Sequence, residues 1–281
     1  PELVGEPSPA GWSFTPSLAT TMAWDDNVFI QGRGDVQAQD LNTGVDPGAT
    51  LAYVGKRGSL TASYGGSLQM YRDFGAINNY AQSLNVSGRR RLSAKTLLFA
   101  QQSYSRLPTT EVPSLIGLRF LRLGAQLADF RGGIEATATK RLSYAASYNF
   151  QKIDFTRHPT LGDNFLGGHA NGGSANARYQ LDERTTLTAD YSVQRATLVT
   201  GNRFLVQNTW GGVDYKLTER TRVFGAAGLA RLGAADLGTG KTSPAWRGGL
   251  SHRFRTASLD VAYGRSFVPS YGGGGTLANE E

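Results

Sequence analysis

The stretch KRGSLTASYGGSLQM, residues 56–70, combines a short basic turn with a segment in which apolar and polar side chains alternate. Leu60 and Tyr64 fall on one face of an extended chain, and Thr61 and Ser63 fall on the other. Successive side chains of a β-strand point to opposite sides, so alternation with period two predicts a strand with one apolar and one polar face. A tight turn in front of such a strand predicts a β-hairpin.

The same unit, a short charged turn between two alternating segments, occurs six times along the chain. The turns lie within residues 53–60, 88–93, 138–143, 180–185, 216–221 and 252–257. Longer segments that carry Gly and Pro lie between them, among them residues 25–44, 107–121 and 157–169. Strands joined alternately by tight turns and long loops are typical of bacterial outer-membrane β-barrels, in which the tight turns face the periplasm and the long loops face outward.

The pattern predicts an all-β fold, an antiparallel up-and-down transmembrane β-barrel with about 13 visible strands. The expected strands are 12–24, 44–54, 59–71, 78–89, 95–106, 122–138, 142–156, 170–181, 185–198, 204–217, 221–232, 244–254 and 257–268. The expected organisation is an N-terminal arm over 1–11, the barrel over 12–271 and a loop-like C-terminal tail over 272–281. Because bacterial single-chain barrels have even strand numbers, the odd number and the Gly-rich tail predict a barrel that is incomplete at its C-terminal end.

Strand length favours a membrane barrel over a soluble sandwich. The expected strands run 11 to 17 residues, whereas soluble strands usually run about 5–6. Trp12 and Trp24 are 12 residues apart on the first strand, which corresponds to roughly 30 Å of height in a tilted strand and suits two aromatic girdles around an apolar band about 25 Å tall. A soluble all-β protein and a secreted β-solenoid or adhesin stay open as alternatives.

The amino-acid composition limits the kinds of site and partner that the protein can have. The 281 residues include no Cys, which excludes disulfides, thiolate metal sites and cysteine nucleophiles. No run approaches the ~20 apolar residues of a transmembrane helix, and the mean hydropathy of -0.32 fits a barrel in which every second residue faces lipid. The net charge of +7 suits anionic partners, and it equally suits Lys and Arg in turns that lie against acidic lipid headgroups.

The alternation also predicts which side chains face the lumen and which face the membrane. The expected lumen-facing residues are Thr61, Ser63, Gln69, Ser147, Asn149, Arg178, Asp190, Asp214, Lys216 and Asp260. The expected lipid-facing or interfacial residues are Trp12, Trp24, Leu60, Tyr64, Tyr144, Tyr148, Leu187, Tyr191 and Tyr263. Mixed charge signs in the first set predict a hydrated polar lumen with partly compensating charges and no strongly selective ring.

Short motifs resemble a known family. Residues 24–29 read Trp-Asp-Asp-Asn-Val-Phe at the end of the first strand, 46–48 read Asp-Pro-Gly before a tyrosine strand, and 266–272 read Ser-Phe-Val-Pro-Ser-Tyr-Gly. These segments resemble the beta-barrel porin-2 family of bacterial outer-membrane proteins. The resemblance implies an outer-membrane barrel, sometimes linked with exopolysaccharide export systems, that continues through further strands after the last motif.

Candidate metal sites are weak. Asp25, Asp26 and Asn27 place three oxygen-bearing side chains together, which suits a hard cation such as calcium, although an Asx turn that begins a loop explains them more simply. His158 and His169 share an expected loop with acidic residues. A loop-borne pair without regular spacing is a poor ligand set, so surface histidines are the favoured interpretation and no metal is expected.

The sequence lacks the patterns of an enzyme. It contains no Gly-x-Ser-x-Gly elbow, and Gly238-Thr239-Gly240-Lys241-Thr242 imitates a phosphate loop without its first glycine or a following helix pattern. We therefore predict no catalysis and no cofactor. The expected function is a passive, porin-like conduit in the bacterial outer membrane for solutes or polysaccharide.

The alternative is a non-transporting surface scaffold, an adhesin, or an accessory subunit of an exopolysaccharide export system. The expected partners are outer-membrane lipid and lipopolysaccharide, with an anionic solute or polysaccharide as cargo and no nucleic acid. The sequence leaves the oligomeric state, the cargo and the pore size open.

Overall fold

The computed structural model of the 281-residue chain describes residues 10–26, 39–75, 78–107, 124–155, 167–199, 201–234, 240–270 and 275–280. These residues form a single antiparallel sheet of fourteen strands in which each strand pairs with the next along the chain. The strands are β1 (Gly11–Asp25), β2 (Asp40–Gly55), β3 (Gly58–Tyr71), β4 (Asn79–Ser93), β5 (Thr96–Leu107), β6 (Ala125–Thr137), β7 (Leu142–Phe155), β8 (Gly168–Gln180), β9 (Thr185–Leu198), β10 (Arg203–Lys216), β11 (Thr221–Ala234), β12 (Gly240–Arg253), β13 (Ser258–Ser270) and β14 (Gly275–Glu280).

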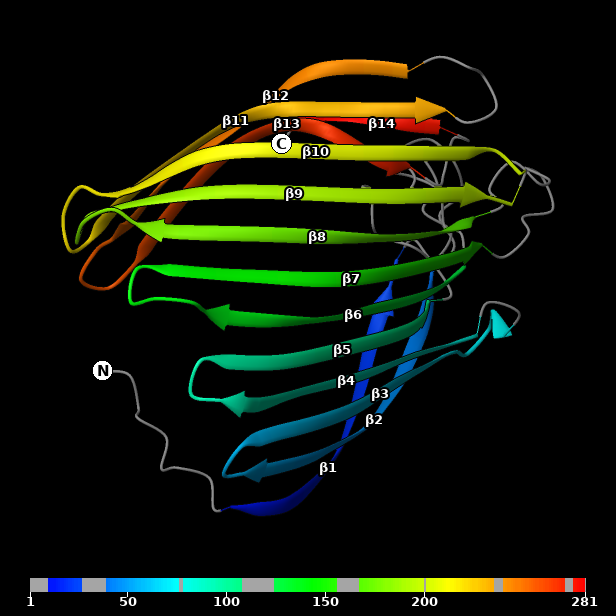
Figure 1. The fold of residues 1–281 in the computed structure, drawn as a ribbon. Coiled ribbons are helices and arrows are strands. Elements are labelled where there is room, and N and C mark those ends of the chain that lie inside the picture. Colours follow the sequence, from blue (N-terminus) through cyan, green and yellow to red (C-terminus); the bar gives the residue numbers. More distant parts are fainter. Residues whose placement is uncertain are drawn as a thin grey trace.

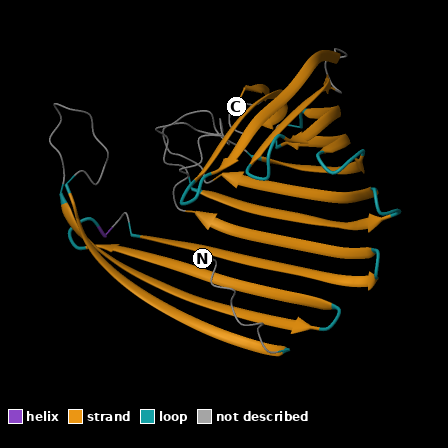
Figure 2. Ribbon diagram, turned by 90° about the vertical axis from the view of Figure 1, so that its left-hand side faces the viewer, coloured by secondary structure: helices purple, strands orange, loops and turns teal. Residues whose placement is uncertain are grey.

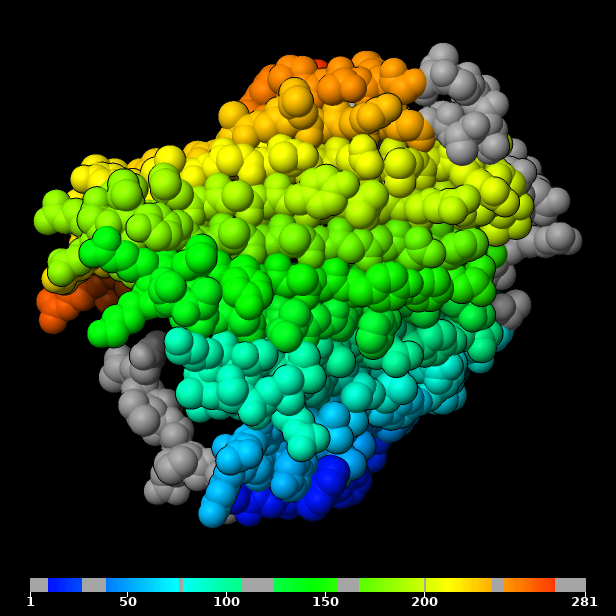
Figure 3. All heavy atoms as spheres, in the orientation of Figure 1, coloured from blue at the N-terminus to red at the C-terminus, as the bar shows by residue number. Residues whose placement is uncertain are grey.

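The sheet is strongly curved, with one concave and one convex face (Figures 1 and 2). Strands β1 to β6 form an open trough, and the following strands turn over into a curl in which β13 comes close to β10 and β11. Figure 3 shows the middle strands as one continuous outer wall on the convex face. In the sheet formed by the described residues, β1 and β14 are the two edges and do not pair with each other.

Side chains within the tight turns fix several hairpins. Between β8 and β9 the Asp182 carboxylate accepts hydrogen bonds from the backbone N–H groups of Arg184 (2.7 Å) and Thr185 (2.8 Å). Between β6 and β7 the Thr139 hydroxyl accepts from the N–H groups of Arg141 and Leu142 at 3.2 and 3.0 Å. Asp and Thr at the start of a turn satisfy its backbone donors in this way, which explains why the chain reverses at these points.

The all-β, up-and-down architecture expected from the sequence is confirmed. Each of the thirteen expected strands exists, and the strand over 185–198 has the expected bounds. The largest differences are four residues each: β4 ends at Ser93 instead of 89, and β2 and β12 start at Asp40 and Gly240 instead of 44 and 244. Gly and Pro near those starts suggested loops, but the paired neighbouring strand supplies hydrogen-bonding partners that carry the extended conformation through them.

The C-terminal tail differs from the expectation. Residues 272–281 were expected to be loop-like, yet they contain a fourteenth strand, β14 (Gly275–Glu280), whose partners lie in the segment from Arg265 to Ser270. A strand edge offers a row of free backbone groups, so a Gly-rich segment beside it can pair without an alternating side-chain pattern. Of the predicted N-terminal arm, residues 1–9 lie outside the described residues, and Gly11 already belongs to β1.

The interior of the curl is apolar at the long-loop end. Ile153, Ala170, Ala196 and Leu198 form one buried cluster on β7 to β9. Val206, Ala230 and Ala245 form a second cluster on β10 to β12. Pairing register places both clusters on the concave face. Among the described residues, no helix is long and apolar enough to cross a membrane.

Candidate functional site

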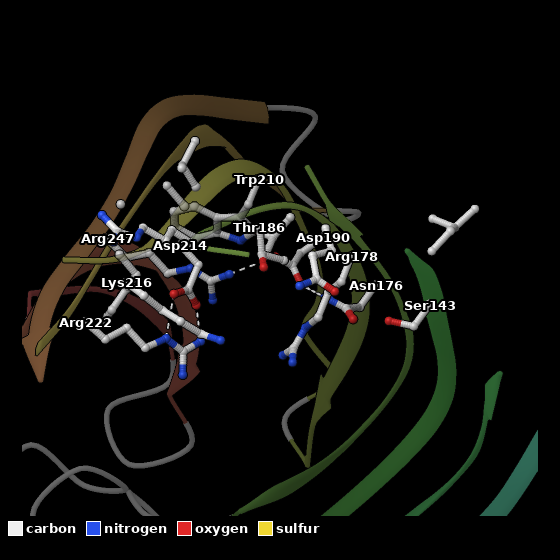
Figure 4. A pocket seen from close by; sticks show the side chains of 18 of the residues that line it. Ser143, Asn176, Arg178, Thr186, Asp190, Trp210, Asp214, Lys216, Arg222 and Arg247 are labelled. Atoms are coloured by element: carbon white, nitrogen blue, oxygen red, sulfur yellow. Dashed lines mark hydrogen bonds and ion pairs between the residues drawn. The ribbon is translucent and has the colours of Figure 1, made fainter. Parts of the chain in front are cut away.

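A cavity of about 990 Å³ lies on the concave face, at the tight-turn end of strands β6 to β13 (Figure 4). The curl of the sheet makes it, because β8 to β10 form one side and β11 to β13 the other. Unlike the buried clusters at the opposite end of the same strands, this region is lined by charged and polar side chains.

The pairing register explains why these side chains meet. Arg178 on β8 is paired with Thr188 on β9, and its neighbour two residues earlier, Asn176, is paired with Asp190. Asp190 is in turn paired with Trp210 on β10. Paired residues of adjacent strands lie on the same face. The side chains of both rows therefore point into the curl, as Figure 4 shows for the labelled ones.

The lining carries a large excess of positive charge. The cavity is lined by seven cationic side chains and two carboxylates of the described residues, a formal balance of +5. The cations are Lys140, Arg141, Arg178, Arg184, Lys216, Arg222 and Arg247, and the carboxylates are Asp190 and Asp214. Arg265 also borders the cavity, but it belongs to the convex face by register and its guanidinium lies over the Trp246 ring.

Both carboxylates are already engaged. Asp214 accepts from the guanidinium of Arg222 through two of its nitrogens. Asp190 accepts from Arg247 Nη2 at 2.8 Å and from the side-chain amide of Asn176 at 2.6 Å. With the acids neutralised by these partners, the net positive charge of the cavity remains for a bound anion.

Two cations extend into the cavity without a partner. Arg178 and Lys216 make no side-chain hydrogen bond or ion pair with the described residues, and Figure 4 shows the Arg178 side chain projecting into the open space. The Arg247 guanidinium lies 5.2 Å from the centroid of the Trp210 ring, and its bond to Asp190 fixes it from the other side. The site therefore combines guanidinium groups that are fixed by carboxylates with one guanidinium and one ammonium group that have no partner among the described residues.

The structure brings four of the ten expected lumen residues to this cavity: Arg178, Asp190, Asp214 and Lys216. The others lie elsewhere on the same face by register. Ser147 exchanges a 2.8 Å hydrogen bond with Ser174 and lines an adjoining cavity, and Asp260 accepts from Ser251 at 2.5 Å. The remaining residues of the set are Thr61, Ser63, Gln69 and Asn149.

The expected lipid-facing residues share the opposite, convex face by register. They are Trp12, Trp24, Leu60, Tyr64, Tyr144, Tyr148, Leu187, Tyr191 and Tyr263. All nine side chains are at least partly exposed, from 37% for Tyr64 to 63% for Trp12 and Trp24. Whether lipid covers them stays a prediction.

One expectation about the lumen needs correction. The concave face is not polar throughout, because the buried clusters around Ile153 and Val206 occupy the long-loop end. Its charges partly compensate, as expected, since Asp214 pairs with Arg222 and Asp190 with Arg247, two arginines outside the expected set. Sequence reasoning missed these two arginines because small residues on both faces of the segments around them left the phase open, although the hairpin pairing Lys216↔Arg222 would have located one.

The candidate metal residues are only partly described by the structure. The described residues contain no group of three or more His, Cys, Asp or Glu side chains suited to a metal ion. Asp25 is paired in register with Asp40, and Asp40 is buried and accepts from the backbone N–H groups of Leu41, Asp73 and Phe74. Asn27 and His158 lie outside the described residues, and so does Gly238 of the imitated phosphate loop.

Comparison with known proteins shows the fold. No protein-family model matches the chain, and no curated protein sequence matches it. A solved structure titled bacterial polysaccharide outer membrane secretin superposes with a TM-score of 0.55 at 12% sequence identity, over 94% of this chain and 94% of that chain. The shared architecture is that of an outer-membrane β-barrel. The finer resemblance to the porin-2 family stays a prediction.

Other outer-membrane proteins superpose less well. An outer membrane channel from Pseudomonas putida F1 has a TM-score of 0.44 at 15% identity, over 92% of this chain and 96% of that chain. A FadL homologue from Pseudomonas aeruginosa has a TM-score of 0.43 at 13% identity, over 96% of this chain and 86% of that chain. The fold assignment rests on the higher-scoring superposition alone.

Proposed function

We propose that the chain is a bacterial outer-membrane conduit whose concave, tight-turn end attracts anionic solutes or an acidic polysaccharide. The observation that carries the proposal is the cavity of about 990 Å³ with seven cationic side chains against two engaged carboxylates. Rings of Arg and Lys are how pores favour anions. The tight turns place this end at the periplasmic side, where an outgoing polymer would enter.

The length and pattern of the strands support the membrane placement. The spanning strands β1 to β13 have 12 to 16 residues, which exceeds the 9–11 residues that a tilted strand needs to cross the hydrocarbon region. The convex face presents Trp, Tyr and Leu side chains along many strands. An aqueous protein rarely exposes an apolar surface of this extent.

The arrangement of charges suits a conduit better than a storage site. Arg178 and Lys216 are free to contact a passing anion, while Arg222 and Arg247 are held by Asp214 and Asp190. Several cations at short spacing let an anionic chain exchange one contact for the next, and the two carboxylates limit how tightly any one group binds. Conduction requires binding that is favourable but weak enough to release.

The test is conductance of the full chain in a planar bilayer under a salt gradient. We expect a reversal potential of the sign that marks anion preference, and we expect Arg178→Gln/Lys216→Gln to lower that preference several-fold. The matched control is Arg195→Gln/Arg231→Gln, which removes the same charge from the convex face and should leave selectivity unchanged.

Two outcomes would overturn the proposal. An inserted chain without conductance would favour the alternative, a non-transporting scaffold or accessory subunit of an export system. An inserted chain that conducts cations in preference to anions would contradict the role given to the basic cavity, and so would equal effects of the two double variants.

A further inference from the structure

The convex face carries a shallow groove of about 980 Å³ over strands β2 to β7. Two adjacent rows of paired residues line it, and both rows belong to the convex face by register. The row nearer the tight turns is Gly58, Arg90, Leu98, Ile134 and Ala146; the second row is Leu60, Gly88, Ala100, Gly132 and Tyr148.

Short side chains make the floor of this groove. In the second row, Gly88, Ala100 and Gly132 stand on three successive strands between the larger Leu60 and Tyr148. At ~4.8 Å per strand, the two walls are about 19 Å apart. The Phe130 ring lies against Gly132, where an added Cβ would come 3.1 Å from Phe130 Cζ, and its centroid is 6.4 Å from that of Tyr148. Phe130 and Tyr148 thus bound the depression on its β6–β7 side, and Gly88 and Ala100 leave its floor low.

The tight-turn end of the groove is basic. Lys56 and Arg57 form the turn between β2 and β3, and Arg90 occupies the first row on β4; all three line the groove and are exposed. Their side chains have no hydrogen-bonding or ionic partner among the described residues. The sequence contains no Asp or Glu from residue 74 to residue 110, so the neighbouring strands supply no counter-charge.

We propose that this groove binds one anionic glycerophospholipid of the periplasmic leaflet. Its acyl chains lie over Gly88 and Ala100 and against the Phe130 ring, and its phosphate receives charge-assisted hydrogen bonds from Lys56, Arg57 and Arg90. The inference rests on the proposed function, since it requires the convex face to meet lipid and the tight turns to face the periplasm.

Charge complementarity selects this occupant. An apolar surface that ends in three unpaired cations matches a molecule with hydrocarbon chains and one anionic head. A second copy of the chain packed symmetrically on the groove would bring two sets of these cations together, and like charges at an interface oppose association. The leaflet at the tight-turn end of a barrel is the periplasmic one, which favours a glycerophospholipid.

The experiment reconstitutes the full chain with an equimolar mixture of phosphatidylglycerol and phosphatidylethanolamine and counts retained lipids by native mass spectrometry. We expect one retained phosphatidylglycerol. The variant Lys56→Gln/Arg57→Gln/Arg90→Gln should weaken its retention roughly a hundred-fold, at about fivefold per cation. The control Arg220→Gln/Arg253→Gln/Arg255→Gln removes three tight-turn charges that do not line the groove and should retain the lipid.

A second pair of variants tests the apolar part. Ala100→Leu fills the floor and should displace the lipid while all cations remain. Should that variant fail to give the heat-modifiable folded form, Gly88→Ala is the milder change, since its Cβ would lie 3.5 Å from Leu60 Cδ1 in ordinary contact; it should weaken retention several-fold.

Distinct outcomes separate the two proposals. A chain that inserts and conducts but retains both lipids equally overturns the lipid site alone, and so does equal loss in the charge variant and its control. Retention of phosphatidylglycerol by the filled groove also overturns it. A chain that does not insert into bilayers overturns the lipid site together with the proposed function.

Discussion

The side chains of the concave face are largely uncharged in the open trough and charged at the cavity of the curl. Across the middle of β3 to β5 this face presents uncharged small side chains, whereas β8 to β12 present the paired and free charges of the cavity. The uncharged set is Thr61, Ser63, Ser67, Ser83, Asn85, Ser87, Gln101, Ser103 and Ser105.

Curvature explains the difference. Asp190 on β9 and Arg247 on β12 are three strands apart, about 14 Å along a flat sheet, yet their side chains meet at 2.8 Å. In the curl, a charge on one strand reaches a partner across the interior. In the trough there is no opposite wall to supply one, and the strands there carry Ser and Thr, which satisfy each other locally or bind water. The curvature of the sheet thus decides whether its concave face can carry paired charges or only uncharged polar groups.

The largest expected effect concerns the apolar end of the curl. Ile153 is fully buried against Ala170, Ala196 and Leu198, so Ile153→Ala should lower the free energy of unfolding by about 2–5 kcal/mol, through lost apolar contact and a residual cavity. Leu84 on β4 is 42% exposed on the convex face, and Leu84→Ala should cost clearly less. Urea unfolding from lipid vesicles measures both. Similar losses of stability would mean that Ile153 in the curl and Leu84 in the trough are equally well packed.

The strand map was predictable because alternation is local. Leu60, Tyr64, Thr61 and Ser63 reveal their faces without knowledge of their neighbours, and β3 lies where the pattern places it. The start of β12 at Gly240 and the existence of β14 were not predictable in this way. Those segments are extended because an adjacent strand pairs with them, which is a property of the sheet and not of the segment.

The candidate site was predictable only in part for the same reason. Arg178 and Asp190 lie on strands with clear alternation, and the structure places both at the cavity. Arg247 meets Asp190 only because the sheet curls over between β9 and β12, and no local pattern encodes that contact. The buried layer around Ile153 escaped notice because alanines opposite it blur the distinction between faces.

The second expected effect is the cost of placing an arginine on the convex or the concave face, in the trough and in the curl. Leu60 in the trough and Leu187 in the curl are equally exposed, at 38% and 39%, on the convex face. If lipid covers both, Leu60→Arg and Leu187→Arg should each lower the free energy of unfolding. Both residues lie two positions inside a tight-turn strand end, so the expected cost is below the ~2–4 kcal/mol of a charge at the bilayer midplane. Thr61→Arg and Thr188→Arg place the charge on the concave face, where it stays hydrated, and should cost less.

Folding of the four variants into lipid vesicles, followed by urea titration, gives the comparison. Equal losses for Leu60→Arg and Thr61→Arg would contradict the assignment of faces in the trough. A penalty at Leu60 without one at Leu187 would indicate that lipid covers the convex face of only one region, and that the curl is shielded.

The smallest expected effect concerns the turns, which also differ between the regions. The turn between β2 and β3 is basic, with Lys56 and Arg57, whereas the β8–β9 turn is organised by the exposed Asp182. The pKa of Asp182 lies below its usual value, first because of the hydrogen bond from the Arg184 backbone N–H and then because of those from the Thr185 hydroxyl and N–H.

A lowered folded-state pKa means that this turn contributes stability at pH values above the ordinary Asp pKa, and that the contribution disappears as the pH falls through the lower, folded-state pKa. The Thr139 turn uses a hydroxyl in the same position and has no such dependence.

Asp182→Thr should therefore remove the pH dependence of the β8–β9 hairpin, as in the β6–β7 hairpin. Amide hydrogen exchange at residues 184–186, compared between neutral and acidic pH, should show protection that decreases with acidification in the native chain, relative to the global trend, but not in the variant. Because the carboxylate is exposed, the difference should be small and confined to this hairpin. A constant difference between the two proteins across the acid range would show that the carboxylate stays uncoupled from the stability of the turn.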